Sequence, residues 1–154
     1  MIVAERKGMD EILKMVEGTK RLLLVGCGTC VTVCMAGGEK EVGILASLLR
    51  LARERMGDPI EIEEITIERQ CEWEFVDSLR EKVEAADAVL SMACGVGVQA
   101  IAKRFPGKVV LPALNTKFFG MPEKQGFWVE LCAGCGDCVL DRTGGICPVA
   151  RCSK

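Results

Sequence analysis

Residues 21–27 read Arg-Leu-Leu-Leu-Val-Gly-Cys, a run of large apolar residues that leads directly into a glycine and a cysteine. The run has no polar alternation, so both of its faces are expected to be buried, as in a central strand of a parallel sheet. A second run of this kind, residues 88–92, is also followed closely by a cysteine, Cys94. These two segments predict an α/β fold in which cysteines follow buried strands.

Outward from this stretch, helical and strand patterns alternate along the chain. The predicted helices are residues 9–17, 39–56, 73–86 and 96–105, and the predicted strands are residues 21–25, 60–67, 88–92 and 108–111. A phase shift at Glu63 and Glu64 predicts that the second strand is a half-exposed, bulged edge strand. Alternation of this kind requires right-handed crossovers. It predicts a doubly wound parallel sheet of about four strands with helices on both faces.

The sequence divides after residue 112. Residues 1–112 are predicted to form a Rossmann- or flavodoxin-like α/β domain, and residues 113–154 a connection followed by a small cysteine-rich metal-binding domain. Proline and glycine interrupt residues 112–130, which predicts an irregular connection whose Phe118 and Phe119 are either core anchors or a docking patch. The tail, residues 131–154, has few large apolar residues. Something other than burial must order it, and bound metal is the natural candidate.

Charge and hydropathy narrow the class of protein. The net charge is −2, and basic residues are mixed with acidic ones, so no basic stripe is available to follow a nucleic acid. The apolar runs are far shorter than the roughly 20 residues needed to cross a bilayer, so no membrane insertion is expected. Glu5, Arg6 and Lys7 directly follow the first residues, which is unlike a secretory leader. A cytoplasmic location is therefore expected.

The chain has 10 cysteines and no histidine. Disulfide scaffolds are usually short and lack a large core, whereas this chain has the apolar content for one. The absence of histidine excludes a Cys-His catalytic pair, imidazole zinc sites and Rieske-type ligation. Thiolate-only sites for zinc or iron–sulfur clusters remain.

The tail group of cysteines has the spacing of a metal site. Its members are Cys132, Cys135, Cys138, Cys147 and Cys152. Pairs separated by two residues can turn their thiolates toward one centre, because Gly134 and Gly136 give the backbone the freedom to fold around them. The first four are the preferred ligands, and Cys152 can replace one of them. The spacing leaves iron–sulfur and zinc open.

The sheet-edge group is dispersed in sequence but alike in position. Its members are Cys27, Cys30, Cys34, Cys71 and Cys94. Three of them follow successive predicted strands, so in a parallel sheet they lie along the carboxyl edge, where open α/β folds gather ligands. The alternative is a set of unrelated buried cysteines. As ligands, Cys27, Cys30, Cys71 and Cys94 are preferred over Cys34.

Two glycine motifs accompany this group. Gly95-x-Gly97-x-x-Ala100 resembles a dinucleotide fingerprint in outline, but no acidic residue ends the following strand. The favoured reading is that small residues let a loop pass close to a cluster. The amides of Gly37 and Gly38 are available either to an anion or to cluster sulfur.

Residues 132–152 read CAGCGDCVLDRTGGICPVARC and closely resemble the C-terminal domain associated with methylenetetrahydrofolate reductases. The resemblance extends to residues 26–39, 69–71 and 93–97, and so includes every cysteine. The whole chain is similar to the MetV family, the small iron–sulfur subunits of two-subunit reductases. Members of that family continue beyond the Arg-Cys-x-Lys segment with a further cysteine, whereas this sequence ends at Lys154. Cys152 is then a candidate to replace the missing ligand.

The resemblance implies an electron-transfer role in one-carbon metabolism. It implies a [4Fe-4S] cluster at the sheet edge, a second [4Fe-4S] cluster or Zn in the tail, and a flavin-bearing MetF-type partner. Ferredoxin or another carrier is the implied electron donor. We expect a subunit without catalytic residues of its own. The rival functions are a zinc-bound adaptor that assembles partner proteins and a dinucleotide-binding enzyme that uses Gly95 and Gly97.

Overall fold

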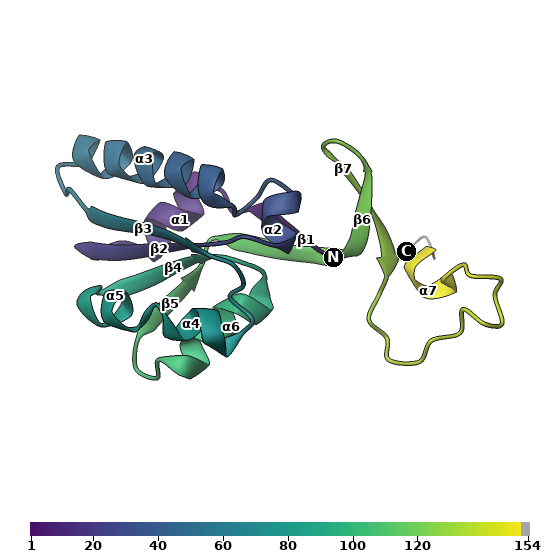
Figure 1. The fold of residues 1–154 in the computed structure, drawn as a ribbon. Coiled ribbons are helices and arrows are strands. Elements are labelled where there is room, and N and C mark those ends of the chain that lie inside the picture. Colours follow the sequence, from purple (N-terminus) through teal and green to yellow (C-terminus); the bar gives the residue numbers. More distant parts are fainter. Residues whose placement is uncertain (152–154) are drawn as a thin grey trace.

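The computed structural model describes residues 1–151, which form two sheets with helices around one of them (Figure 1). In chain order the elements are β1 (Ile2–Arg6), α1 (Met9–Met15), β2 (Arg21–Cys27), α2 (Cys30–Val33), α3 (Glu39–Arg55), β3 (Glu61–Ile67), α4 (Trp73–Asp77), α5 (Arg80–Ala85), β4 (Ala88–Met92), α6 (Gly95–Arg104), β5 (Val109–Pro112), β6 (Leu114–Lys124), β7 (Phe127–Cys132) and α7 (Pro148–Arg151).

The larger sheet is parallel and has the strand order β3-β2-β4-β5. Helices α1 and α3 cover one face, and α4, α5 and α6 cover the other (Figure 1). We call this sheet and its helices the α/β unit. The predicted four-stranded parallel sheet with helices on both faces is confirmed.

Alternate residues of β2 supply the two cores. Leu22 and Leu24 pack with α1 and α3, whereas Leu23 and Val25 pack with α4, α5 and α6. All four are at most 1% exposed. Because β2 is buried on both faces, its run of apolar residues needs no polar alternation, as the sequence predicted.

Two predicted details of the α/β unit are wrong. The helix predicted over residues 73–86 is divided into α4 and α5. At the division, the Leu79 amide donates to the carbonyl oxygen of Val76, three residues back and not four, and the Ser78 hydroxyl donates to the Phe75 carbonyl oxygen at 2.7 Å. The predicted bulge in β3 is also absent, since its register with β2 is unbroken. The two adjacent acidic residues there are paired on opposite sides by Arg50 and Lys82.

The second sheet is antiparallel, with the order β1-β6-β7. Residues 112–130, predicted to be irregular, therefore form the end of β5 and most of a hairpin, which we call the ribbon (β6 and β7). The glycine and proline residues that suggested a loop are accommodated by register shifts at Phe119/Gly120 and Pro122/Lys124. The N-terminal strand β1 pairs with β6. The predicted division of the chain after residue 112 stays a prediction.

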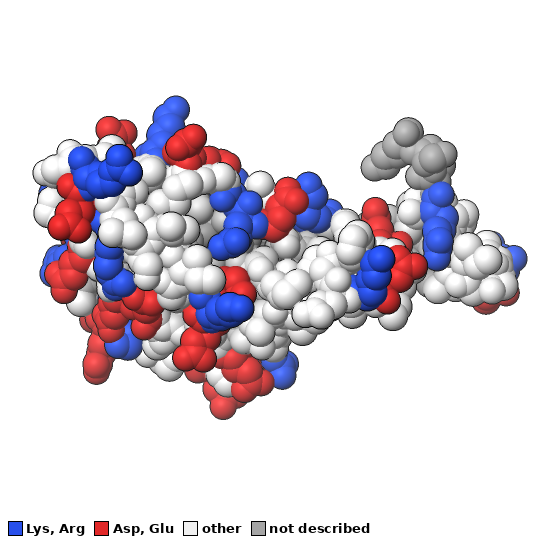
Figure 2. Space-filling model, turned by 90° about the horizontal axis from the view of Figure 1, so that it is seen from above, with Lys and Arg blue, Asp and Glu red and all other residues white. Residues whose placement is uncertain are grey.

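The ribbon extends away from the α/β unit and leads to the tail (Figure 1). Lys and Arg are mixed with Asp and Glu on the face of the α/β unit seen in Figure 2, and much of the ribbon surface carries neither. Among the described residues, no helix combines the length and the apolar character needed to span a membrane.

Candidate metal centres

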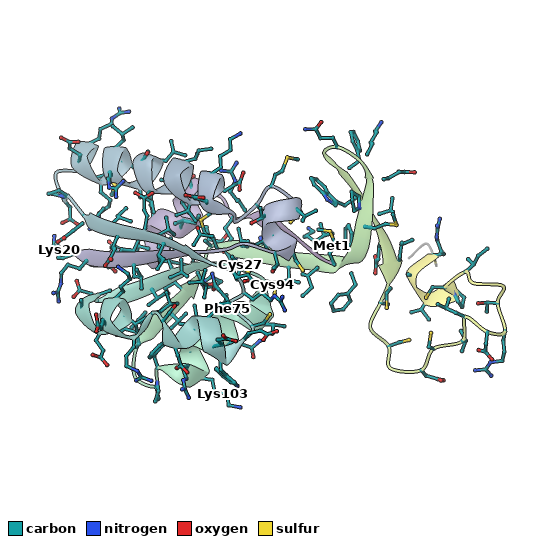
Figure 3. All side chains as sticks on the ribbon, in the orientation of Figure 1. Met1, Lys20, Cys27, Phe75, Cys94 and Lys103 are labelled. Carbon is teal, nitrogen blue, oxygen red and sulfur yellow. The ribbon has the colours of Figure 1, made fainter. Side chains whose placement is uncertain are left out.

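The strand order of the parallel sheet reverses between β2 and β4. The chain leaves β2 through α3 on one face, and it leaves β4 through α6 on the other. Open α/β sheets bind ligands at such a point, beyond the carboxyl ends of the two strands. Cys27 is the last residue of β2, and Cys94 is the N-cap of α6, two residues after β4. Figure 3 shows Cys27 and Cys94 at this edge.

Cys71 joins these two residues from the loop after β3. Its environment raises the pKa of the Cys71 thiol, first through partial burial and also through the nearby sulfurs of Cys27 and Cys94. The Cys27 sulfur lies 3.9 Å from the carbonyl oxygen of Glu68, in the same loop. Cys27, Cys71 and Cys94 therefore lie at one edge of the sheet, near enough for the first and last to influence the Cys71 thiol, and their role as ligands stays a prediction.

The other two cysteines of the sheet-edge group lie on α2. Cys30 opens this short helix and is partly exposed. Cys34 is buried, and its thiol donates to the carbonyl oxygen of Ala4 in β1 at 3.4 Å. Burial is the main cause that raises the pKa of the Cys34 thiol. Its contacts fit the alternative of a core cysteine, and the preference for Cys30 as a ligand stays a prediction.

The glycine motifs around this edge serve close packing. A Cβ atom on Gly97 would lie 2.7 Å from the Cβ atom of Ala93 and 2.8 Å from that of Gln70. The absence of a side chain at position 97 thus lets α6 approach the loop that carries Cys71. The amides of Gly37 and Gly38 donate to Val31 O and Glu41 Oε2, so the chain itself already uses both.

Gln70 is the residue at this edge whose role the sequence analysis missed. It is 1% exposed and hydrogen bonds to both β2 and β4. A polar residue directly before a candidate ligand was the available signal. A side-chain amide gives no periodicity that would reveal such a bridge.

The four preferred ligands of the tail line one hollow of about 230 Å³. They are Cys132, Cys135, Cys138 and Cys147. Leu131, Val139, Leu140 and Val149 line the same hollow and give it apolar walls. Each described cysteine of the tail group therefore faces the same space, although none of residues 131–151 is buried.

Backbone amides point at two of these sulfurs. Gly134 N donates to the Cys132 sulfur at 3.4 Å, and Ala150 N donates to the Cys147 sulfur at 3.5 Å. Gly134 has a φ of 65° and Gly136 a φ of 83°, as the predicted turn around the thiolates requires. Amide-to-sulfur hydrogen bonds stabilise negative charge on thiolates that bind metal.

Both sets of thiols have the chemistry of metal ligands, but among the described residues of each set the side chains do not meet at one point. All cysteines in residues 1–151 are free thiols. Over the same residues, no three His, Cys, Asp or Glu side chains converge closely enough to hold a single ion. A tetrahedral zinc site with Zn–S bonds of about 2.3 Å would place its sulfurs about 4 Å apart. A cluster leaves them farther apart, because each sulfur binds a different iron. The clusters or zinc ion predicted at these two sets of thiols stay predictions.

Residues 111–154 match the family model described as methylene-tetrahydrofolate reductase C terminal. This segment is similar to that family. The matched segment comprises the end of β5, the ribbon and the whole tail group. The match confirms the resemblance that the sequence of the tail predicted.

No curated protein and no solved structure matches the chain. The resemblance of residues 26–39, 69–71 and 93–97 to small subunits of these reductases lies outside the matched segment and stays a prediction. Cys152 lies within the match but outside the described residues, so its role as a substitute ligand also stays a prediction.

Proposed function

We propose that this chain is an iron–sulfur electron-transfer subunit for a flavin-bearing, MetF-type methylenetetrahydrofolate reductase. This proposal is supported by the observation that Cys132, Cys135, Cys138 and Cys147 line one hollow, within a segment that matches the reductase C-terminal family. A second set, Cys27, Cys71 and Cys94, lies at the carboxyl edge of the sheet. Clusters, when bound, supply one-electron storage and transfer.

The chain's own groups suit both sites to negative charge. In the tail, the amides of Gly134 and Ala150 donate to thiolate sulfurs. At the sheet edge, Cys94 occupies the N-cap position of α6, where the helix dipole stabilises an anion. Reducing a methylene group to a methyl group takes two electrons. The subunit would therefore receive electrons singly from a carrier such as ferredoxin and deliver two to the partner's flavin.

The first test is the metal content of anaerobically purified protein. Two [4Fe-4S] clusters give about eight iron and eight sulfide atoms per chain, and one cluster with one zinc gives about half of that iron. Cys135→Ser and Cys71→Ser should each lower the iron content by removing one site. Cys34→Ser, the matched control, should leave it unchanged. Zinc without sulfide in the wild-type protein would support the structural adaptor instead.

The second test is electron delivery. The reduced wild-type subunit is mixed with a MetF-type flavoprotein, and flavin bleaching is followed by stopped-flow absorbance. We expect fast flavin reduction that Cys135→Ser and Cys71→Ser slow and Cys34→Ser does not. Flavin reduction that ignores the presence of the subunit would refute the electron-transfer role.

A further inference from the structure

Gln70 bridges the two strands between which the strand order reverses. Its Nε2 donates to the Val25 carbonyl oxygen at 2.8 Å, and its Oε1 accepts from the Ser91 hydroxyl at 2.5 Å. Val25 and Ser91 are register partners in β2 and β4. Gln70 is thus tied to both strands just below the candidate site, and it is itself 1% exposed.

The opening turn of α6 closes over the same side chain. Gly97 is buried, and its missing Cβ atom would lie 2.8 Å from that of Gln70. Any larger residue at position 97 would push α6 away from the loop after β3. Gln70 therefore lies between the paired strands and the helix, in contact range of the elements that carry Cys27, Cys71 and Cys94.

We infer that Gln70 is a positioning residue that sets the separation of Cys27, Cys71 and Cys94. Each contact lies close in sequence to one of these thiols: Val25 precedes Cys27 by two residues, Ser91 precedes Cys94 by three, and Gln70 directly precedes Cys71. An amide satisfies its donor and acceptor only when strands and loop keep their relative places. This inference rests on the proposed function, because the thiols so positioned are the proposed ligands.

The substitutions remove the bridge in two independent ways. Gln70→Met keeps the length of the side chain but has no amide, and Ser91→Ala removes one partner from a different element. The matched controls are Gln125→Met, at the exposed turn between β6 and β7, and Ser47→Ala, at an exposed position in α3. Circular dichroism reports whether each variant folds. Should Gln70→Met fail to fold, Ser91→Ala carries the test.

In iron-loaded protein, Gln70→Met should weaken retention of the sheet-edge cluster by about 10–100-fold, as the loss of hydrogen-bond partners around metal ligands does. The readout is iron retained during titration with a chelator. Ser91→Ala should keep its iron but change the electron paramagnetic resonance spectrum and the midpoint potential of that cluster. Both controls should match the wild type. Unchanged iron retention, spectrum and potential in both bridge variants would overturn the inference.

A test without metal separates the two proposals. If the wild-type protein is purified without iron, the proposed function is refuted, but the inference about Gln70 can still be tested on the metal-free chain. Dibromobimane joins neighbouring thiols, and mass spectrometry identifies the joined peptides. We expect wild-type protein to link Cys71 with Cys27 or Cys94, and both bridge variants to do so several-fold more slowly. Equal rates in all variants would refute the role of Gln70.

Discussion

The α/β unit and the tail present their thiols in opposite ways. At the sheet edge, Cys27 and Cys94 stand at the ends of segments whose apolar residues are almost completely buried. In the tail, no residue from 131 to 151 is buried, yet four cysteines share one hollow. Burial of the strands therefore fixes the positions of Cys27 and Cys94, whereas under the proposed function the order of the tail depends on bound metal. The two regions should respond differently to the same perturbation.

Metal removal should give the largest difference. Structural metal contributes on the order of 10 kcal/mol to the folding of small metal-binding domains. We therefore expect iron chelation to raise the rate of tryptic cleavage after Arg142 strongly, while the α/β unit keeps its circular dichroism and its cooperative unfolding. Mass spectrometry of timed digests measures the cleavage.

Cys135→Ser should reproduce the fast cleavage without a chelator, and Cys34→Ser should not. A tail that resists trypsin equally well with and without metal would show that its own packing holds it together.

A pair of leucine truncations compares the two regions directly. Leu90, in β4, is 0% exposed, whereas Leu131, at the start of the tail, is 36% exposed. Leu90→Ala should lower the free energy of unfolding by about 2–5 kcal/mol, because it leaves a cavity between β4 and α3. Leu131→Ala should change it by less than about 0.5 kcal/mol. Urea unfolding followed by circular dichroism measures both, and equal losses would erase the distinction between the regions.

The same contrast explains which parts of the fold could be predicted. The run in β2 and the helical spacing in α3 are local signals of burial, and they predicted the parallel sheet. The pairing of β1 with β6 joins residues more than 100 positions apart, and the ribbon contains Gly120 and Pro122, which read as breakers. A sequence pattern cannot show that register shifts will absorb them.

The candidate sites follow the same rule. Position after a strand predicted that Cys27, Cys71 and Cys94 lie at one edge of the sheet, and spacing predicted that the described cysteines of the tail group face one space. Their roles as ligands stay predictions. The orientation of Cys34 toward Ala4 depends on β1, which the sequence analysis did not recognise. The bridge made by Gln70 depends on a side-chain conformation, which no spacing reveals.

Two glycines test how rigid each region is. A Cβ atom on Gly37 would lie 2.1 Å from the Met92 carbonyl oxygen in the α/β unit, and one on Gly120 would lie 1.9 Å from the Val129 carbonyl oxygen in the ribbon. Overpacking typically costs about 1–3 kcal/mol. We expect the loss of unfolding free energy to lie near the upper end of this range for Gly37→Ala and near the lower end for Gly120→Ala, because most residues of the ribbon are exposed and its strands can shift.

Gly8→Ala is the control, since a Cβ atom there would meet nothing within 4 Å. Denaturant unfolding measures all three variants. A larger loss for Gly120→Ala than for Gly37→Ala would mean that the ribbon is the more rigid of the two.

Low pH should give the smallest difference between the two regions, and it should destabilise the α/β unit. The Arg104 side chain, through a hydrogen bond, lowers the pKa of Asp77 below its ordinary value of 3.8, and the backbone amide of Arg21 does the same for Asp87. The unfolded chain thus binds more protons than the folded one near this pH, so stability falls as pH drops below about 4.

Asp77→Asn combined with Asp87→Asn should flatten that fall, and Asp137→Asn in the tail should not. Because these variants carry the same thiols as the wild type, the difference in slope isolates the carboxylates from acid loss of metal. Identical slopes from pH 6 to 3 in the double variant and the wild type would show that Asp77 and Asp87 contribute nothing to the pH dependence of the stability of the unit.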